Sequence, residues 1–170
     1  MDIDTNCEIV VRTQFAHNLL LQRESSLNDY NLSINLLNDT KAEKDFVAIN
    51  PLTQTIPELD IIDAYSIQLI NIKRKLDSGR VIRGHKVGLS SKAMQSMMGV
   101  DEPDYGHLLD DFFYYNGDTI QSKKFFIPRI EVELAYVLGK TLPAPNCTIK
   151  DVLDSTEYIQ PALELIDSRI

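Results

Sequence analysis

The spacing of apolar residues changes character about halfway along the chain. In the first half the spacing is helical, and residues 8 to 22 carry apolar side chains in a pattern that predicts a first helix. A stronger helix is predicted from Asp60 to Ser78, with Asp60 as N-cap and Gly79 as the stop. Residues 23 to 47 are polar and are expected to form a surface loop or a loosely ordered insert. The apolar stripe of the stronger helix, expected to pack in the core, consists of Ile62, Tyr65, Leu69, Ile72 and Leu76.

Beyond residue 80 the pattern favours short strands separated by turns. We predict a short buried strand at 81–89, a short helix at 91–98 and a tight turn at 101–106. An apolar stretch at 108–115 is followed by a hairpin-type turn at 116–118. A strand is expected at 127–138, and a helix from 149 to 158 with Thr148 as its N-cap. These elements predict an α+β fold in which N-terminal helices precede a β-rich second half.

The strand predicted at 127–138 carries two acidic residues on one face. Because side chains alternate along a strand, Glu131 and Glu133 point the same way. Two carboxylates so close repel each other in a half-buried segment, and a divalent cation with oxygen ligands relieves that repulsion. The same pair also occurs at the wet end of ordinary half-buried strands, so both interpretations stay open here. The opposite face is apolar throughout and consists of Ile130, Val132, Leu134, Tyr136 and Leu138.

A third carboxylate strengthens the case for a metal ion. Glu164 lies in the apolar run 162–166, and an acid there needs a partner because charged side chains are seldom buried alone. An ion pair with Arg129 or Arg169 is one possibility and metal ligation is the other. Three carboxylates together favour Mg²⁺ or Mn²⁺. The three histidines show no ligand spacing along the sequence, which disfavours zinc.

Two further residues are candidates for proton transfer. Lys86 lies between glycines and apolar residues in the segment 84–88. It is either a surface lysine with a buried stem, or a cation held in an apolar site where it binds a carboxylate or carries a proton. Asp104, in the turn at 103–106, is either a turn former or a general base presented on a loop.

Composition narrows the function classes. The chain has 170 residues, 44% hydrophobic and 25% charged, which is typical of a soluble globular domain. A net charge of -8 argues against nucleic acid or an anionic membrane as partner. Two cysteines without metal-like spacing fit a reducing compartment, and no signal peptide or membrane-spanning run is recognisable. We therefore expect a cytoplasmic protein.

Four segments in order resemble a known enzyme family. They are GHKVGLSSKAMQ at 84–95, DEPDYG at 101–106, PRIEVELA at 128–135 and PALELIDSR at 161–169. Together they resemble the 2-keto-4-pentenoate hydratase family of the fumarylacetoacetate hydrolase superfamily. The resemblance covers about residues 48 to 170. It divides the chain into an N-terminal helix with a polar insert, 1–47, and a partial hydratase domain, 48–170.

The resemblance implies a barrel-like mixed sheet of the fumarylacetoacetate hydrolase type, incomplete at the C-terminus. It implies a hydro-lyase of meta-cleavage aromatic catabolism that adds water to a 2-oxo-4-enoate, with the 2-oxo-hept-4-ene-1,7-dioate hydratase branch most similar. The family's metal ligands fall on Glu131, Glu133 and Glu164, and its active-site residues fall on Lys86 and Asp104. Mg²⁺ or Mn²⁺, a small unsaturated 2-oxo acid and self-association into a homo-oligomer are expected. A 4-oxalocrotonate-type decarboxylase, or an inactive truncated remnant or partner subunit, remain the alternatives.

Overall fold

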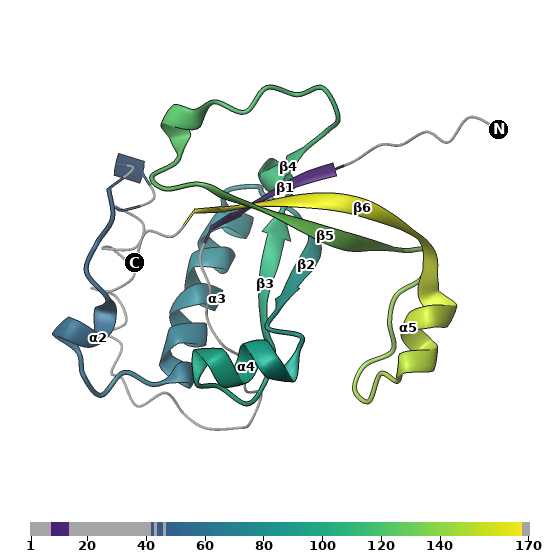
Figure 1. The fold of residues 1–170 in the computed structure, drawn as a ribbon, viewed down its shortest axis with the longest axis horizontal. Helices are drawn as coiled ribbons and strands as arrows, with labels where there is room; N and C mark the ends of the chain where they lie inside the picture. The colour runs from purple at the N-terminus through teal and green to yellow at the C-terminus, as the bar shows by residue number, and fades with distance from the viewer. Residues whose placement is uncertain (1–7, 14–41, 43, 46, 168–170) are drawn as a thin grey trace.

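The computed structural model describes residues 8–13, 42, 44–45 and 47–167, which form a mixed arrangement of helices and strands (Figure 1). A twisted pair of long strands lies across a short β-hairpin, and the longest helix stands beside that hairpin. The helices are α2 (Leu52–Thr55), α3 (Ile61–Asp77), α4 (Lys92–Met98) and α5 (Ile149–Ser155), with 3-10 turns η1 (Asp110–Phe112) and η2 (Ser122–Lys124). The strands are β1 (Glu8–Thr13), β2 (Ile82–Gly88), β3 (Asp104–Leu109), β4 (Phe113–Tyr114), β5 (Arg129–Leu138) and β6 (Thr156–Asp167).

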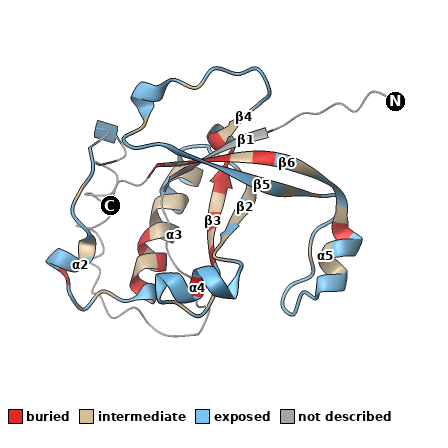
Figure 2. Ribbon diagram, in the orientation of Figure 1, coloured by how far each residue is buried: buried red, intermediate tan, exposed pale blue. Residues whose placement is uncertain are grey.

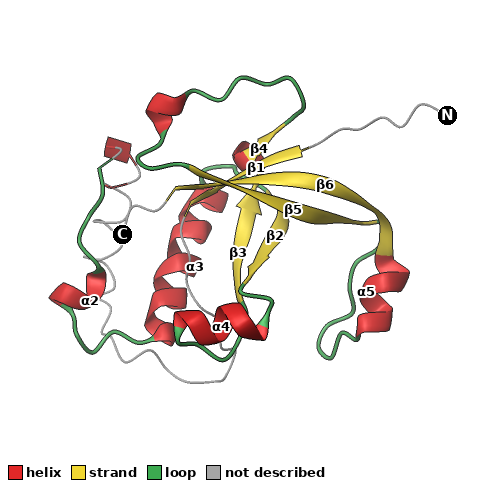
Figure 3. Cartoon of the chain, in the orientation of Figure 1, coloured by secondary structure: helices red, strands yellow, loops and turns green. Residues whose placement is uncertain are grey.

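The larger sheet has four strands in the order β4-β1-β6-β5. The strands β5 and β6 pair antiparallel over their whole length, and α5 connects them at one end (Figure 3). On its other side β6 pairs parallel with β1, and β1 pairs antiparallel with β4. The strand β6 is therefore interior, whereas β5 forms an edge of the sheet among the described strands.

The second sheet is the antiparallel hairpin β2–β3, and α3 packs against it. Buried Leu108, Leu109 and Phe112 form one core cluster, to which α3 contributes Ile72 and Leu76. Figure 2 shows the buried residues gathered on α3, β3 and the interior strand β6. The strands of these two sheets do not close into a barrel within the described residues, so the barrel-like part of the expectation is not seen there.

The predicted helix at 60–78 is confirmed as α3. Asp60 caps it by accepting a hydrogen bond from the backbone N–H of Asp63, whose side chain accepts one from the Asp60 N–H in return. Gly79 follows with φ +97°, a conformation that glycine adopts without strain. One stripe position differs from the prediction, since Leu69 is exposed and Ile67 is buried instead, packed against Ile56.

The helix predicted from residue 8 is wrong for residues 8–13, which form strand β1. The local sequence Glu-Ile-Val-Val-Arg-Thr is rich in β-branched residues, whose stiff side chains suit an extended backbone better than a helix. Parallel pairing with β6 then gives this strand a partner along its whole length. The rest of that predicted helix, 14–22, and most of the polar insert lie outside the described residues.

Three other predictions differ in part from the structure. The predicted strand 81–89 is confirmed as β2, although it is half-buried, with alternating exposure. The turn at 116–118 exists, but the flanking strands do not form a hairpin because β4 pairs with β1. The helix beginning after Thr148 ends at Ser155, and residues 156–158 already belong to β6. In the last two cases pairing between strands far apart along the chain decided the outcome.

The apolar face of β5 that the sequence identified is largely exposed in the described structure. Ile130, Val132 and Leu134 are 68%, 83% and 63% exposed, and no described element covers them. β5 is pale blue along much of its length in Figure 2. None of the described helices is long and apolar enough to cross a membrane.

Candidate metal centre

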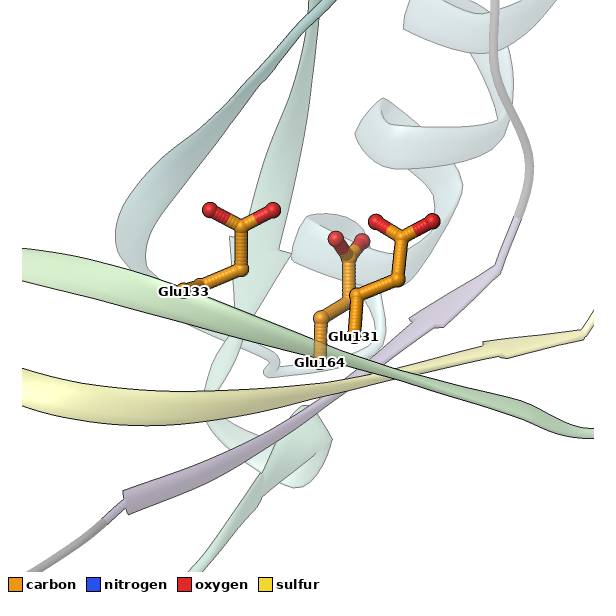
Figure 4. Close-up of side chains that lie close together, drawn as sticks. All are labelled: Glu131, Glu133 and Glu164. Carbon is orange, nitrogen blue, oxygen red and sulfur yellow. The ribbon is translucent and has the colours of Figure 1, made fainter.

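The register of β5 against β6 brings the three candidate ligands together. Glu131 lies directly opposite Glu164, and Glu133 follows two residues later on the same face. One oxygen of each carboxylate lies within 4.8 Å of the other two. Figure 4 shows the three side chains rising from the same side of the two strands. The structure therefore groups the three acidic residues that the sequence singled out.

The three carboxylates differ in burial because their strands differ in position. Glu164 is only 3% exposed, since β6 is flanked by both β1 and β5. Glu131 and Glu133 lie on the edge strand, and the Glu133 side chain is 38% exposed. A buried carboxylate beside two others is costly unless a cation neutralises them. The donor set is all oxygen, as hard divalent cations prefer, so the residues present fit a metal ion of that kind.

Lys86 of β2 supplies a positive charge at this site. Its Nζ lies 2.6 Å from Oε1 of Glu133 and also forms an ion pair with Glu164. Burial on its own lowers the pKa of Lys86, but the hydrogen bonds and the attraction of the two carboxylates outweigh burial and raise it above its ordinary value. The side chain is 13% exposed, so Lys86 is a largely buried cation that binds carboxylates and not a surface lysine. The ion pair shown for Glu164 is thus made by a residue other than the arginines considered from the sequence.

Asp104 was expected in a turn, but it begins strand β3 and is 4% exposed. Pairing with β2 draws the segment into a ladder, and the Tyr105 ring stacks on Tyr65 of α3 with centroids 5.3 Å apart. Asp104 lies opposite Gly88, so it shares the face of the hairpin that carries Lys86. It is not among the residues that line the cavity described next.

A cavity of about 230 Å³ adjoins the carboxylates. It is lined by Lys86, Glu131 and Glu133, by the segment 87–91 that joins β2 to α4, and by Met94 of α4. Gly106, opposite Lys86, leaves open space, since an added Cβ would meet nothing within 4 Å. The arrangement leaves room for a small molecule beside the carboxylates and the ammonium group.

Gln95 fixes the loop that lines this cavity. Its amide nitrogen donates to the carbonyl oxygen of Leu89 at 2.7 Å, and its amide oxygen accepts from Lys92 Nζ at 2.9 Å. Leu89 has φ +50°, an unfavourable conformation for a leucine, and the hydrogen bond from Gln95 helps to hold it. Sequence reasoning missed this residue, although a polar side chain in a short helix otherwise rich in methionine is a usable signal.

Asp167 fixes the segment that leads into β5. Its carboxylate accepts hydrogen bonds from the backbone N–H groups of Phe126 and Ile127, at 2.9 and 2.8 Å, and it is 1% exposed. A carboxylate that accepts two N–H groups in a buried position holds the chain firmly. Because Asp167 ends the described part of β6, it ties the start of β5 to the far end of its partner strand.

Comparison with known proteins shows which family the chain belongs to. No family model matches the chain. The 2-oxo-hept-4-ene-1,7-dioate hydratase of Escherichia coli is 50% identical over 129 residues, which is 76% of this chain and 48% of that protein. The 2-keto-4-pentenoate hydratase of Paraburkholderia xenovorans (strain LB400) is 42% identical over 122 residues, 72% of this chain and 45% of that protein. The chain belongs to the 2-keto-4-pentenoate hydratase family.

The solved structures agree with this membership. The 4-oxalocrotonate decarboxylase from Pseudomonas putida G7, complexed with magnesium and adipate, superimposes with a TM-score of 0.78 at 33% sequence identity. The match covers 86% of this chain and 56% of that chain. The same enzyme complexed with calcium and acetate matches equally well. This chain of the hydratase family spans about half the length of the curated relatives it matches.

Proposed function

We propose that the chain is a metal-dependent hydratase that adds water to the double bond of a 2-oxo-4-enoate in meta-cleavage aromatic catabolism. The observation that carries this proposal is the convergence of Glu131, Glu133 and Glu164 beside Lys86 at a cavity. Similarity to the Escherichia coli enzyme makes 2-oxo-hept-4-ene-1,7-dioate the first substrate to test.

The three glutamates would hold a Mg²⁺ or Mn²⁺ ion. Their oxygen ligands suit either ion, and relatives of known structure were solved with magnesium or calcium. When bound, the ion would supply a Lewis acid for the carboxylate and 2-oxo oxygens of the substrate. Glu164, held in the interior strand, would fix the position of the site, while the more exposed Glu131 and Glu133 complete it from the edge strand.

Lys86 and Asp104 would manage the protons of the reaction. Water addition requires a proton to reach a substrate carbon while hydroxide adds to the neighbouring one. The Lys86 ammonium, at the wall of the cavity, is placed to donate at Nζ and to attract the anionic substrate. Asp104 lies on the same face of the hairpin and would serve as the base or orient the attacking water.

A second candidate is the decarboxylation of a vinylogous 2-oxo acid, which the similarity to the Pseudomonas putida G7 enzyme favours. A third is an inactive remnant or a partner subunit. Purified protein with Mg²⁺ and the dienoate separates them: hydration removes the dienoate chromophore without CO₂, decarboxylation releases CO₂, and a remnant does neither. Absence of chromophore loss in a folded, metal-loaded sample would refute the hydratase.

Metal binding is tested independently of activity. Glu164→Gln should weaken Mn²⁺ binding, measured by calorimetry, by about tenfold or more. Glu157→Gln, at an exposed position on the same strand, is the matched control and should bind like the parent. Equal binding by both variants would contradict the assignment of the ligands.

We also propose that the protein is cytoplasmic, which rests on its composition, and that it self-associates and is divided at residues 47 and 48, which rests on the family resemblance. Light scattering of the purified chain tests the self-association. Limited proteolysis tests the division, because a boundary should yield a resistant fragment that starts close to residue 48.

A further inference from the structure

Two histidines lie directly opposite each other on the β2–β3 hairpin. His85 and His107 are paired in register, with ring centroids 5.0 Å apart and ring planes at 59°. Since side chains alternate along a strand, the pair lies on the face of the hairpin opposite Lys86. Neither histidine has a part in the proposed hydratase.

The separation of the rings is compatible with a shared metal ion. Two imidazole nitrogens bound at about 2.1 Å to one ion, with a near-tetrahedral angle between them, place their ring centres about 5 Å apart. Burial, and after it the neighbouring His85, lowers the pKa of His107. His85 lies at the surface, yet the atoms packed around its ring still lower its pKa. Both rings are therefore neutral at pH 7, the form that binds metals.

Two buried polar atoms, one on α3 and one on β3, have no hydrogen-bond partner in the described part of the chain. They are Nδ1 of His107 and Oε1 of Gln68. Gln68 lies one turn beyond Tyr65 on α3, and His107 lies two residues beyond Tyr105 on β3. Because the Tyr65 and Tyr105 rings stack, both polar atoms belong to the same stretch of the helix–hairpin contact.

The packing further along confirms that α3 and β3 run side by side in the same direction. Ile72 and Leu76 of α3 contact the cluster that includes Leu108 and Phe112, which lies beyond His107. Gln68 thus falls between two points of contact on the helix, as His107 does on the strand. Buried polar atoms nearly always have a hydrogen-bond partner or a ligand in folded proteins. Two such atoms without a partner at the same height of the contact between α3 and β3 therefore indicate a missing polar ligand.

We propose that His85 and His107, with Gln68 as a third ligand, bind a late first-row transition-metal ion such as Zn²⁺, Ni²⁺ or Co²⁺. Imidazole nitrogens suit these ions and not Mg²⁺, so this site is chemically distinct from the three carboxylates. The spacing of the histidines along the sequence gave no sign of it because the ligands meet across two paired strands.

Titration with Co²⁺ tests the proposal, because nitrogen-bound Co²⁺ absorbs visible light. The full chain is titrated in excess Mg²⁺, which does not compete for imidazole. We expect saturation at one ion per chain, and His85→Ala and His107→Ala should each weaken binding about tenfold or more. His17→Ala, outside the described residues, should bind like the parent. Glu131→Gln should also bind normally, which separates this site from the carboxylates.

The proposal is overturned if the parent does not bind Co²⁺, if both histidine variants bind normally, or if Glu131→Gln abolishes binding. Circular dichroism in EDTA checks that each variant is folded. If His107→Ala fails that check, His85→Asn decides alone, because its surface position tolerates a polar replacement.

Discussion

Replacing Lys86 with methionine removes the ammonium group from the three carboxylates while keeping the length of the side chain. In the metal-free protein this leaves Glu164, 3% exposed, beside two other acids without the cation that contacts it now. Removing one partner of a buried ion pair costs about 3 to 5 kcal/mol. The Glu133 side chain is 38% exposed, so water screens the attraction between Glu133 and Lys86. We therefore expect Lys86→Met to lower the free energy of unfolding by about 3 kcal/mol, the lower end of that range.

The same variant should behave differently when a divalent cation is present. A cation bound by the three carboxylates takes over the electrostatic role of the ammonium group, so Mg²⁺ should restore most of the loss. Without the competing ammonium group, Lys86→Met should also bind Mg²⁺ more tightly than the parent. Urea unfolding in EDTA and in millimolar Mg²⁺ measures both effects. In thermal unfolding the EDTA sample should melt roughly 6–12 °C lower than the parent.

Lys73→Met is the matched control. Lys73 pairs with Asp77 on α3, but both side chains are well exposed, so its loss should change stability by no more than about 0.5 kcal/mol. An equal loss for Lys86→Met with and without Mg²⁺ would show that the lysine acts through packing alone. No loss in EDTA would refute the electrostatic argument altogether.

Three further changes test how the site is held in place. Asp167→Asn should cost about 1.5–3 kcal/mol in urea unfolding, because a buried charged acceptor of two N–H groups is lost, whereas exposed Asp118→Asn should cost less. Gln95→Ala should cost about 1–3 kcal/mol because it removes the hydrogen bond that the buried Gln95 amide donates to the Leu89 carbonyl, and it should raise KM more than it lowers kcat if its role is to position the loop. Burial raises the pKa of the Tyr65 hydroxyl above its ordinary 10.0. The stability that neutral Tyr65 contributes is therefore present below pH 10.0 and is lost as the pH rises through the pKa of the folded state. In urea unfolding, Tyr65→Phe should flatten this alkaline loss, and an unchanged dependence of stability on pH would contradict the assignment.

The sequence predicted those features that depend on local spacing. The alternation of side chains placed Glu131 and Glu133 on one face, and the capping residues placed the start and end of α3. Glu164 was singled out because an acid in an apolar run needs a partner, and the structure supplies two kinds, other carboxylates and a lysine. These conclusions needed no knowledge of which strands are neighbours.

The predictions that were wrong concern features that depend on pairing between strands far apart along the chain. Residues 8–13 have weak helical spacing, but their β-branched side chains and their pairing with β6 and β4 make them a strand. Asp104 reads as a turn residue beside Pro103, but pairing with β2 places it in a ladder. The contact between Lys86 and Glu164 joins two different sheets, so no local pattern contains it. Local sequence therefore identified the three carboxylates, and tertiary pairing placed the lysine beside them.

The site also depends on the register of β5 against β6. A slip of one residue would turn Glu131 and Glu133 to the opposite face and bring Ile130 and Val132 toward the cavity. Register at one end is fixed by the two hydrogen bonds that Asp167 accepts just before β5. At the other end an irregularity between residues 137 and 138 interrupts the ladder where the strand approaches α5. The determinants of strand register, far from the carboxylates themselves, therefore also determine whether the three carboxylates of the candidate metal centre lie together.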